Sequence, residues 1–356
     1  MAFKMTFRWY GENDAITLDA IRQIPCMTGV VTAVYDTPVG EVWSNESINR
    51  LKSLANAKGL EFEVVESVPV HEEIKLGGPD AARLIDNYKE NVRRLGNAGV
   101  RCICYNFMPV FDWLRSDLAK QLPDGSNALA YDRDTVLSLD PLKSELSLPG
   151  WDESYTKDGL KELLGRYKDV DEEKLWGNFA TFLKEVIPVA EEYGVRMAIH
   201  PDDPPWGIFG LPRIITGSAS YKRMFSIVDS PYNGITFCTG SLGVDPANKL
   251  PEMIGACKDR IAFAHLRNVK ITGERCFEES GHISDKGSLD MYDIVNALYD
   301  IDFDGYVRPD HGRMIWGEKG RAGYGLYDRA LGAMYLDGII EAVGKARGKY
   351  VPTVKY

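Results

Sequence analysis

Short apolar runs recur along the chain, separated by longer segments in which apolar residues return at helical spacing. Runs that are apolar at nearly every position indicate strands buried on both faces, as in a parallel sheet covered by helices. Such runs, rich in Val, Ile and aromatic residues, predict strands at 6–11, 29–36, 61–67, 100–107, 196–203, 235–243, 261–269 and 305–312.

Amphipathic segments between these strands predict helices. They cover 14–24, 46–58, 80–96, 172–193, 220–229, 250–258, 289–300 and 327–346. Eight buried strands alternating with helices are what a closed (β/α)₈ barrel requires. We therefore predict an α/β fold, a TIM barrel that forms a single domain over residues 1–356.

One connection is much longer than the others. Residues 108–170 follow the fourth predicted strand and contain PVFDWLRSDL, the turn PDGSN and LPGWDESY. In a barrel, the connection after a strand lies on the face that carries the active site. We expect this insertion to form a lid over that face; the alternative is a contact between subunits.

Composition and charge narrow the range of functions. A hydrophobic content of 44% supplies a large core, and a formal net charge of -10 argues against a nucleic-acid partner, which would need clustered Lys and Arg. No stretch approaches the ~20 apolar residues of a membrane span, and the N-terminal sequence lacks the apolar core of a signal peptide. The six cysteines show no framework spacing. We expect reduced thiols, a cytoplasmic location and a small-molecule substrate.

Polar residues end the last four predicted strands. His200, Cys238, His265 and Asp310 each follow a mostly apolar run. Any one of them alone would more often be a packed core residue, but a barrel brings the C-terminal ends of its strands to one point. Two imidazoles, a thiolate and a carboxylate suit a first-row divalent ion, with zinc, ferrous iron and manganese all acceptable. We predict one metal site, and its place at the barrel mouth favours a catalytic role.

The last predicted strand and the loop after it carry further chemistry. Arg308 lies on the same side of its strand as Asp310, so it points inward and needs an anion, either a structural carboxylate or that of a substrate. His311 is the best general-base candidate, with a structural hydrogen-bonding role as the alternative. Tyr324 lies between glycines and is either a second acid–base group or a surface residue.

Polar residues in three other loops are weaker candidates. Asp202 and Asp203 of HPDDPP could bind substrate hydroxyls, orient a ligand imidazole or cap the loop. His71 and His282 follow the third and seventh predicted strands, where each could reach a substrate or remain solvated. Cys102 and Cys104, inside the fourth predicted strand, are assigned to packing.

Several motifs together resemble one family. They are RWYG, GVVTA, GEVWS, VVESVPVHE, CYNFMPVFDW, RMAIHPDDPPWGIFGLPRI, CTGSLG, AHLRN and RPDHG, spread over essentially the whole chain. This set strongly resembles the mannonate dehydratases of the metal-dependent, xylose-isomerase-like barrel type. The segment from Asp112 to Lys174 looks shorter than in some members of that family, so lid contacts are least transferable.

The resemblance implies a reaction and its residues. Family members convert D-mannonate to 2-dehydro-3-deoxy-D-gluconate and water in hexuronate breakdown, using Mn²⁺ or Fe²⁺, and a homodimer is expected from the resemblance alone. The matching motifs place the metal on the four strand-end residues and the substrate beside Arg308, His311 and Tyr324. We also expect Asn106 and Trp113 of CYNFMPVFDW to contact the substrate.

Two other functions remain open from the sequence. A metal-dependent sugar isomerase or epimerase on the same barrel would move a proton between neighbouring carbons without a leaving group, but Cys238 and the inward Arg308 count against it. A sugar-acid-binding protein without activity would bind mannonate and release no product. The proton acceptor is expected to be His311 and the donor Tyr324, although the order could be reversed.

Overall fold

The computed structural model describes residues 3–141 and 157–352, and its core is a closed barrel of parallel strands. Around the barrel the strands follow the order β1-β12-β9-β8-β7-β4-β3-β2. The predicted barrel is confirmed, and each predicted strand overlaps one of the eight observed ones. These are β1 (Lys4–Arg8), β2 (Gly29–Thr32), β3 (Glu61–Glu66), β4 (Cys102–Tyr105), β7 (Arg196–Ile199), β8 (Asn233–Cys238), β9 (Ile261–His265) and β12 (Tyr306–Arg308).

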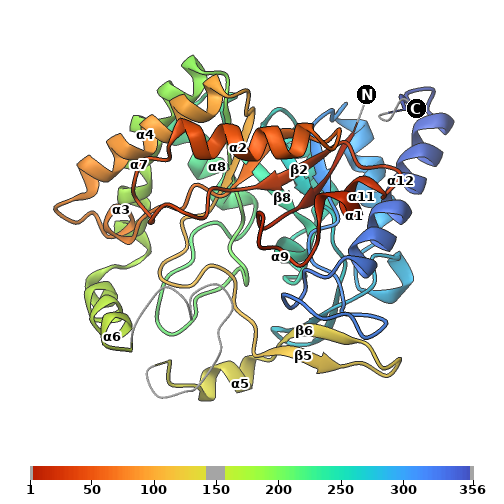
Figure 1. Ribbon diagram of the computed structural model, residues 1–356. Coiled ribbons are helices and arrows are strands. Elements are labelled where there is room, and N and C mark those ends of the chain that lie inside the picture. Colours follow the sequence, from red (N-terminus) through yellow and green to blue (C-terminus); the bar gives the residue numbers. More distant parts are fainter. Residues whose placement is uncertain (1–2, 142–156, 353–356) are drawn as a thin grey trace.

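Helices cover the outside of the barrel, with α2, α4 and α7 on one flank and α11 and α12 on another (Figure 1). Each predicted helix overlaps an observed one. The helices are α1 (Leu18–Arg22), α2 (Asn45–Asn56), α3 (Glu72–Leu76), α4 (Ala81–Asn97), α5 (Arg133–Ser138), α6 (Lys157–Arg166), α7 (Glu172–Glu192), α8 (Ser218–Ile227), α9 (Thr239–Gly243), α10 (Leu250–Ala256), α11 (Met291–Asp300) and α12 (Tyr327–Ala346).

Two apolar clusters correspond to the two faces of the barrel sheet. A small cluster on five of the barrel strands, which we assign to the barrel interior, contains Val31, Val64, Cys102, Cys104, Ala198, Ala262 and Phe263. The larger cluster joins the outer strand faces to the helices. Both faces of the barrel strands therefore carry apolar clusters, as the continuous apolar runs predicted, and Cys102 and Cys104 pack as expected.

A second, antiparallel sheet was not predicted. It has the order β10-β11-β6-β5 and comprises β5 (Asp117–Gln121), β6 (Asn127–Tyr131), β10 (Val269–Gly273) and β11 (Cys276–Glu279). The sequence DLAKQ of β5 is half exposed and too polar to stand out as an apolar run. The seventh predicted strand, 261–269, was too long, because β9 ends at His265 and the chain turns before β10 begins.

This antiparallel sheet joins two parts of the chain that are far apart in sequence. β5 and β6 come from the predicted insertion 108–170, while β10 and β11 form a hairpin after β9. The strands β5 and β6 lie beyond one end of the barrel (Figure 1). Residues 142–156 of the insertion lie outside the described residues, and its assignment as a lid or subunit contact stays a prediction. No helix within the described ranges is long and apolar enough to span a membrane.

A packing prediction follows from the contact between α7 and the barrel. Phe182 of α7 is fully buried, with its ring 4.9 Å from that of Tyr88 and 5.7 Å from that of Tyr105. Phe182→Ala should lower the free energy of unfolding by about 3–5 kcal/mol, because it leaves a cavity against both rings. Urea denaturation followed by tryptophan fluorescence measures the change. Lys184→Ala, at an exposed position of the same helix, should stay within about 0.5 kcal/mol; equal effects would contradict the packing role.

Candidate active site

Four donor groups converge at the ends of four neighbouring strands. His200 directly follows β7, Cys238 and His265 end β8 and β9, and Asp310 lies two residues after β12. The strand register pairs Cys238 with His265, and His265 with Arg308. The ligand atoms of the four residues lie within 4.8 Å of one another. The structure thus brings together the four residues that the sequence predicts as ligands.

The hydrogen-bonding roles of these groups suit a cation. His200 Nδ1 lies 2.7 Å from the carbonyl oxygen of Pro201, so Nδ1 donates and Nε2 presents its lone pair to the other ligand atoms. Cys238 Sγ lies 3.6 Å from Asp310 Oδ2. A thiolate and a carboxylate this close in the interior balance the charge of one divalent ion. Burial raises the pKa of the Cys238 thiol to about 12, so a bound cation would have to displace its proton.

The local backbone around Cys238 fits the same role. Cys238 precedes α9, and its Sγ accepts hydrogen bonds from the backbone N–H of Ser241 at 3.4 Å and from its hydroxyl at 3.2 Å. These donors favour the thiolate form. A Cβ at Gly240 would lie 1.8 Å from Arg267 Nε, so the CTGSLG motif requires glycine there.

A second donor group lies deeper in the barrel and shares one residue with the first. Glu66, Cys104 and His265 also lie within 4.8 Å of one another. Glu66 Oε1, however, accepts a hydrogen bond from Arg308 Nη2 at 3.0 Å, and an adjacent guanidinium disfavours a metal cation. Glu66 Oε2 lies 3.7 Å from His265 Nε2, a position from which the carboxylate can orient this imidazole. We therefore favour the first donor group.

His311 and Tyr324 form a pair beside these ligands. His311 Nε2 and the Tyr324 hydroxyl are 2.7 Å apart, and their rings meet edge to face. Burial lowers the pKa of His311 and raises that of Tyr324 well above its ordinary value. At neutral pH the imidazole is thus uncharged and the phenol is protonated. Tyr324 is only 7% exposed, so the alternative of a surface tyrosine is wrong.

Arg308 points inward and already has carboxylate partners. Its Nη2 donates to Asp310 Oδ1 at 2.6 Å and to Glu66 Oε1. Its Nε and Nη1 are buried and find no hydrogen-bond partner among the described residues. Arg308 therefore binds structural carboxylates and keeps two donor nitrogen atoms, Nε and Nη1, for a substrate oxygen.

A cavity of about 260 Å³ opens onto this centre, a size that suits a small polar molecule. Among the predicted residues it is lined by His200, Arg308, Asp310, His311 and Tyr324, together with Asn106, Trp113 and Asp203. The ring centroids of Trp113 and His311 are 5.2 Å apart. Cys238 and His265 are fully buried behind this lining.

Three predicted substrate residues are not among those that line the cavity. His71 caps α3 by accepting a hydrogen bond from the backbone N–H of Glu73, and it lines a separate small pocket. Buried His282 hydrogen-bonds through Nε2 to the carbonyl oxygen of Pro309. Asp202 accepts from the backbone N–H of Ile215, and burial raises its pKa to about 6. All three hold loops in place, and for Asp202 this was one of the alternatives.

Sequence reasoning missed several charged residues around the centre. Arg8, Glu66 and Arg321 line the cavity, and a buried network contains Arg115, Arg267 and Glu279. The available signal was a charged residue interrupting or ending an apolar run, as in FRWYG, EFEVVE and AHLRN. Such a residue inside a barrel requires a partner.

Comparisons with known proteins fit this geometry. The family model for D-mannonate dehydratase (UxuA) matches residues 3–350. The chain belongs to the D-mannonate dehydratase family. A mannonate dehydratase from Streptococcus uberis is 56% identical over 345 residues, which are 96% of this chain and 99% of the relative. The crystal structure of mannonate dehydratase from Streptococcus suis serotype 2 has a TM-score of 0.94 at 48% identity, covering 100% of this chain and 99% of that one. The resemblance inferred from the motifs is confirmed.

Other solved structures share the barrel with this member of the family. D-Psicose 3-epimerase from Clostridium cellulolyticum H10 has a TM-score of 0.54 at 17% identity, covering 97% of this chain and 98% of that one. At this identity the likeness concerns the fold alone. This likeness therefore supports a shared fold with the epimerase and gives no support to the epimerase reaction.

Cys238 and Cys104, both buried, allow a test of the metal site. Loss of a residue that only hydrogen-bonds to a metal ligand lowers metal affinity by about 10- to 100-fold. Cys238→Ser should lower the affinity for Mn²⁺ by more than this, because it removes a proposed ligand. Cys104→Ser, equally buried in β4, should keep the affinity. Titration calorimetry measures both. Loss of binding in Cys104→Ser with retention in Cys238→Ser would instead place the ion at the deeper donor group.

Proposed function

We propose that this family member dehydrates D-mannonate to 2-dehydro-3-deoxy-D-gluconate and water, as a hydro-lyase. The observation that carries the proposal is the His311–Tyr324 pair, 2.7 Å apart, facing the same cavity as the four-ligand group. Dehydration needs both a proton acceptor and a proton donor beside one electrophilic centre. The family match over residues 3–350 supports dehydration as the reaction.

The charges that line the cavity support an anionic substrate. Arg8, Arg308 and Arg321 all reach it. Arg8 and Arg321 flank the ring of Tyr10, at 4.4 and 4.3 Å from its centroid. Two donor nitrogen atoms of Arg308, Nε and Nη1, have no partner in the described residues. A sugar acid provides the carboxylate and hydroxyl oxygens that such donors bind.

We infer that the ion is Mn²⁺ or Fe²⁺, held by His200, Cys238, His265 and Asp310. These four donors would hold a first-row divalent ion, which would then bind substrate oxygens at the cavity. When bound, the ion supplies Lewis-acid polarisation of the substrate oxygens next to C2. Arg308 provides a second positive group against the charge that develops on the carboxylate.

The acid–base pair can move the required protons without an external group. His311 takes the proton from C2, the C2–C3 double bond forms, and the C3–O bond breaks as Tyr324 protonates the departing hydroxide to water. The resulting enol becomes the 2-keto product. The proton on His311 then passes across the 2.7 Å contact to Tyr324, which restores both groups for the next turnover.

The reaction would belong to the breakdown of hexuronates. A cytoplasmic location agrees with the free cysteines of this chain, and the homodimer rests on the family resemblance. A sugar isomerase or epimerase would use the same ligands without releasing water, and a binding protein would release no product.

The proposed reaction can be tested directly with purified protein. Incubation with D-mannonate and Mn²⁺ should yield a 2-keto-3-deoxy acid, measured by a colour assay, and a chelator should abolish the product because the Lewis acid is removed. Formation of an epimeric sugar acid without this product would favour the epimerase alternative. Binding of mannonate with no turnover would favour the binding protein.

The acid–base pair predicts how substitutions act. His311→Asn should lower kcat by about 10²- to 10⁴-fold while the protein still binds Mn²⁺, because the ring that moves the proton is lost. Tyr324→Phe should have an effect in the same range. The control His71→Asn should retain activity, because asparagine also caps helices well. Steady-state kinetics with metal analysis would refute the assignment if His311→Asn turned over at a near-normal rate.

A further inference from the structure

Four buried charges form a closed ring beside the proposed active site. The ion-pair ring consists of Arg115, Asp203, Arg267 and Glu279, none more than 2% exposed. Arg115 donates to both oxygens of Asp203 at 2.8 and 3.0 Å and to Glu279 at 2.9 Å. Arg267 donates to Asp203 at 2.8 Å and to Glu279 at 3.1 Å. Two positive and two negative groups therefore balance one another away from water.

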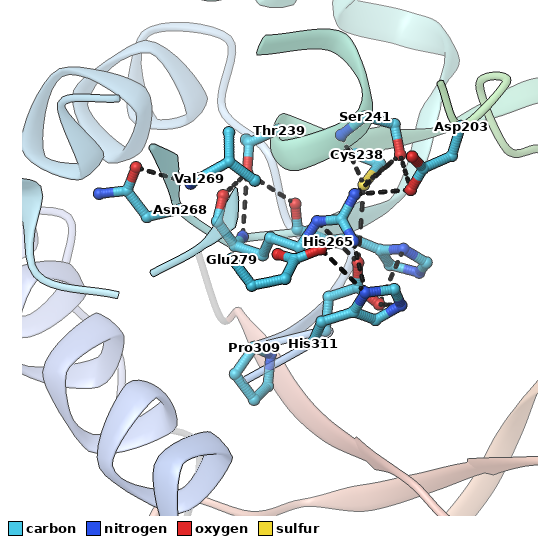
Figure 2. Close-up of polar contacts among 12 residues, drawn as sticks. Asp203, Cys238, Thr239, Ser241, His265, Asn268, Val269, Glu279, Pro309 and His311 are labelled. Carbon is cyan, nitrogen blue, oxygen red and sulfur yellow. Dashed lines mark hydrogen bonds and ion pairs between the residues drawn. The ribbon is translucent and has the colours of Figure 1, made fainter. Parts of the chain in front are cut away.

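The corners of the ion-pair ring come from distant parts of the chain. Arg115 lies in the insertion after β4, Asp203 follows β7, Arg267 follows β9, and Glu279 ends β11 of the antiparallel sheet. Figure 2 shows Glu279 close to His311, and Asp203 close to Ser241 and Cys238. The ring thus connects the antiparallel sheet to the barrel at the metal-ligand group.

The two arginines differ in what else they contact. Arg267 Nη1 lies 2.6 Å from His311 Nδ1, and its Nε lies 3.5 Å from Asp310 Oδ2. Its Nη2 donates to Ser241 Oγ, which in turn donates to Cys238 Sγ. Among the described contacts, Arg115 reaches neither His311 nor any of the four ligands. Its remaining contacts are with the backbone and with the rings of Trp113 and Phe277.

The surroundings of His311 Nδ1 offer a partner for either position of the ring hydrogen. When Nδ1 lacks a hydrogen it accepts from Arg267, and when it carries one it can donate to Glu279 Oε1 at 3.2 Å. For Nε2 to take a proton, Nδ1 must already carry the ring hydrogen, and Glu279 Oε1 then accepts from it. The planar guanidinium of Arg267 contacts His311 through Nη1, Asp203 through Nη2 and Asp310 through Nε. The single ammonium of lysine cannot make these three contacts at once.

We propose that Arg267 is a positioning residue, which fixes the ring of His311 and the carboxylate of Asp310 relative to each other. Arg115, at the opposite corner of the ion-pair ring, holds the same two carboxylates without reaching the centre. The catalytic part of this inference rests on the proposed function. The geometric part, the arrangement of Asp310 in the ligand group, does not.

Two matched substitutions separate positioning from stability. Arg267→Lys and Arg115→Lys each keep the charge and remove guanidinium hydrogen bonds to Asp203 and Glu279, so both should lower the melting temperature. Arg267→Lys should also lower kcat by about 10- to 100-fold, the range for outer partners of metal ligands, with KM within about threefold. Arg115→Lys should keep kcat within about threefold. Equal losses of kcat in the two variants, or a change confined to KM, would overturn the proposal.

A spectroscopic measurement removes the dependence on turnover. In protein loaded with Co²⁺, the ligand-field and thiolate charge-transfer bands should shift in Arg267→Lys, because Asp310 and Ser241 lose a contact, and stay unchanged in Arg115→Lys. Unchanged bands in both variants would contradict the positioning role. If the wild type binds Co²⁺ but does not dehydrate mannonate, the proposed function fails and the spectra still decide this inference. Should Arg267→Lys not fold, Glu279→Gln replaces it: it should lower kcat with KM unchanged, and normal kcat would overturn the proposal.

Discussion

Neutralisation of buried charge is the constraint on which the catalytic face depends. Asp310 and Cys238 place a carboxylate and a thiol 3.6 Å apart in the protein interior. Removing an ion from water costs several kcal/mol unless partners compensate. Burial opposes ionisation of Asp310, but the charged guanidinium groups of Arg308 and Arg267 outweigh it and hold its pKa well below the ordinary value. The carboxylate is thus ionised before any metal arrives.

The same constraint explains why arginines, and not lysines, surround the ligands. Arg308 and Arg267 approach Asp310 from two sides, and each also holds a second carboxylate, Glu66 or Glu279. A guanidinium can bond several acceptors in its plane while remaining charged in the interior. Asp310 itself has a φ of +46°, which is uncommon for a residue other than glycine and is held only where surrounding contacts determine it.

Much of this arrangement was predictable, because a parallel barrel brings the residues at the C-terminal ends of its strands together at one face. Apolar runs predicted the strands. At the end of three such runs, the first side chain able to bind a metal is His200, Cys238 or His265. Asp310 followed from the same rule with a shift of two residues. The rule fails where structure depends on pairing between distant segments. β5 carries no apolar run, so nothing local reveals that it joins β6 and the β10–β11 hairpin.

The same limit accounts for the side chains that were misplaced or missed. His71 and His282 lie in loops after strands, as ligands do, but each is held by a backbone group outside the cavity. Arg115 lies in the insertion, and its two carboxylate partners are 88 and 164 residues away in sequence. The sequence around an arginine does not predict its ion-pair partner. The order of strands in a barrel, by contrast, predicts which strand ends lie next to one another.

The barrel and the loops therefore specify different parts of the chemistry. The strands position the proposed metal ligands, and a scaffold of this kind also occurs in an epimerase of only 17% identity, so the scaffold alone does not choose a reaction. The choice must lie in groups that the strands do not supply. Tyr324 comes from a glycine-containing loop, and Glu279 comes from the antiparallel sheet. Both meet at His311, one on each ring nitrogen, so the proton chemistry is set where the loops close over the barrel.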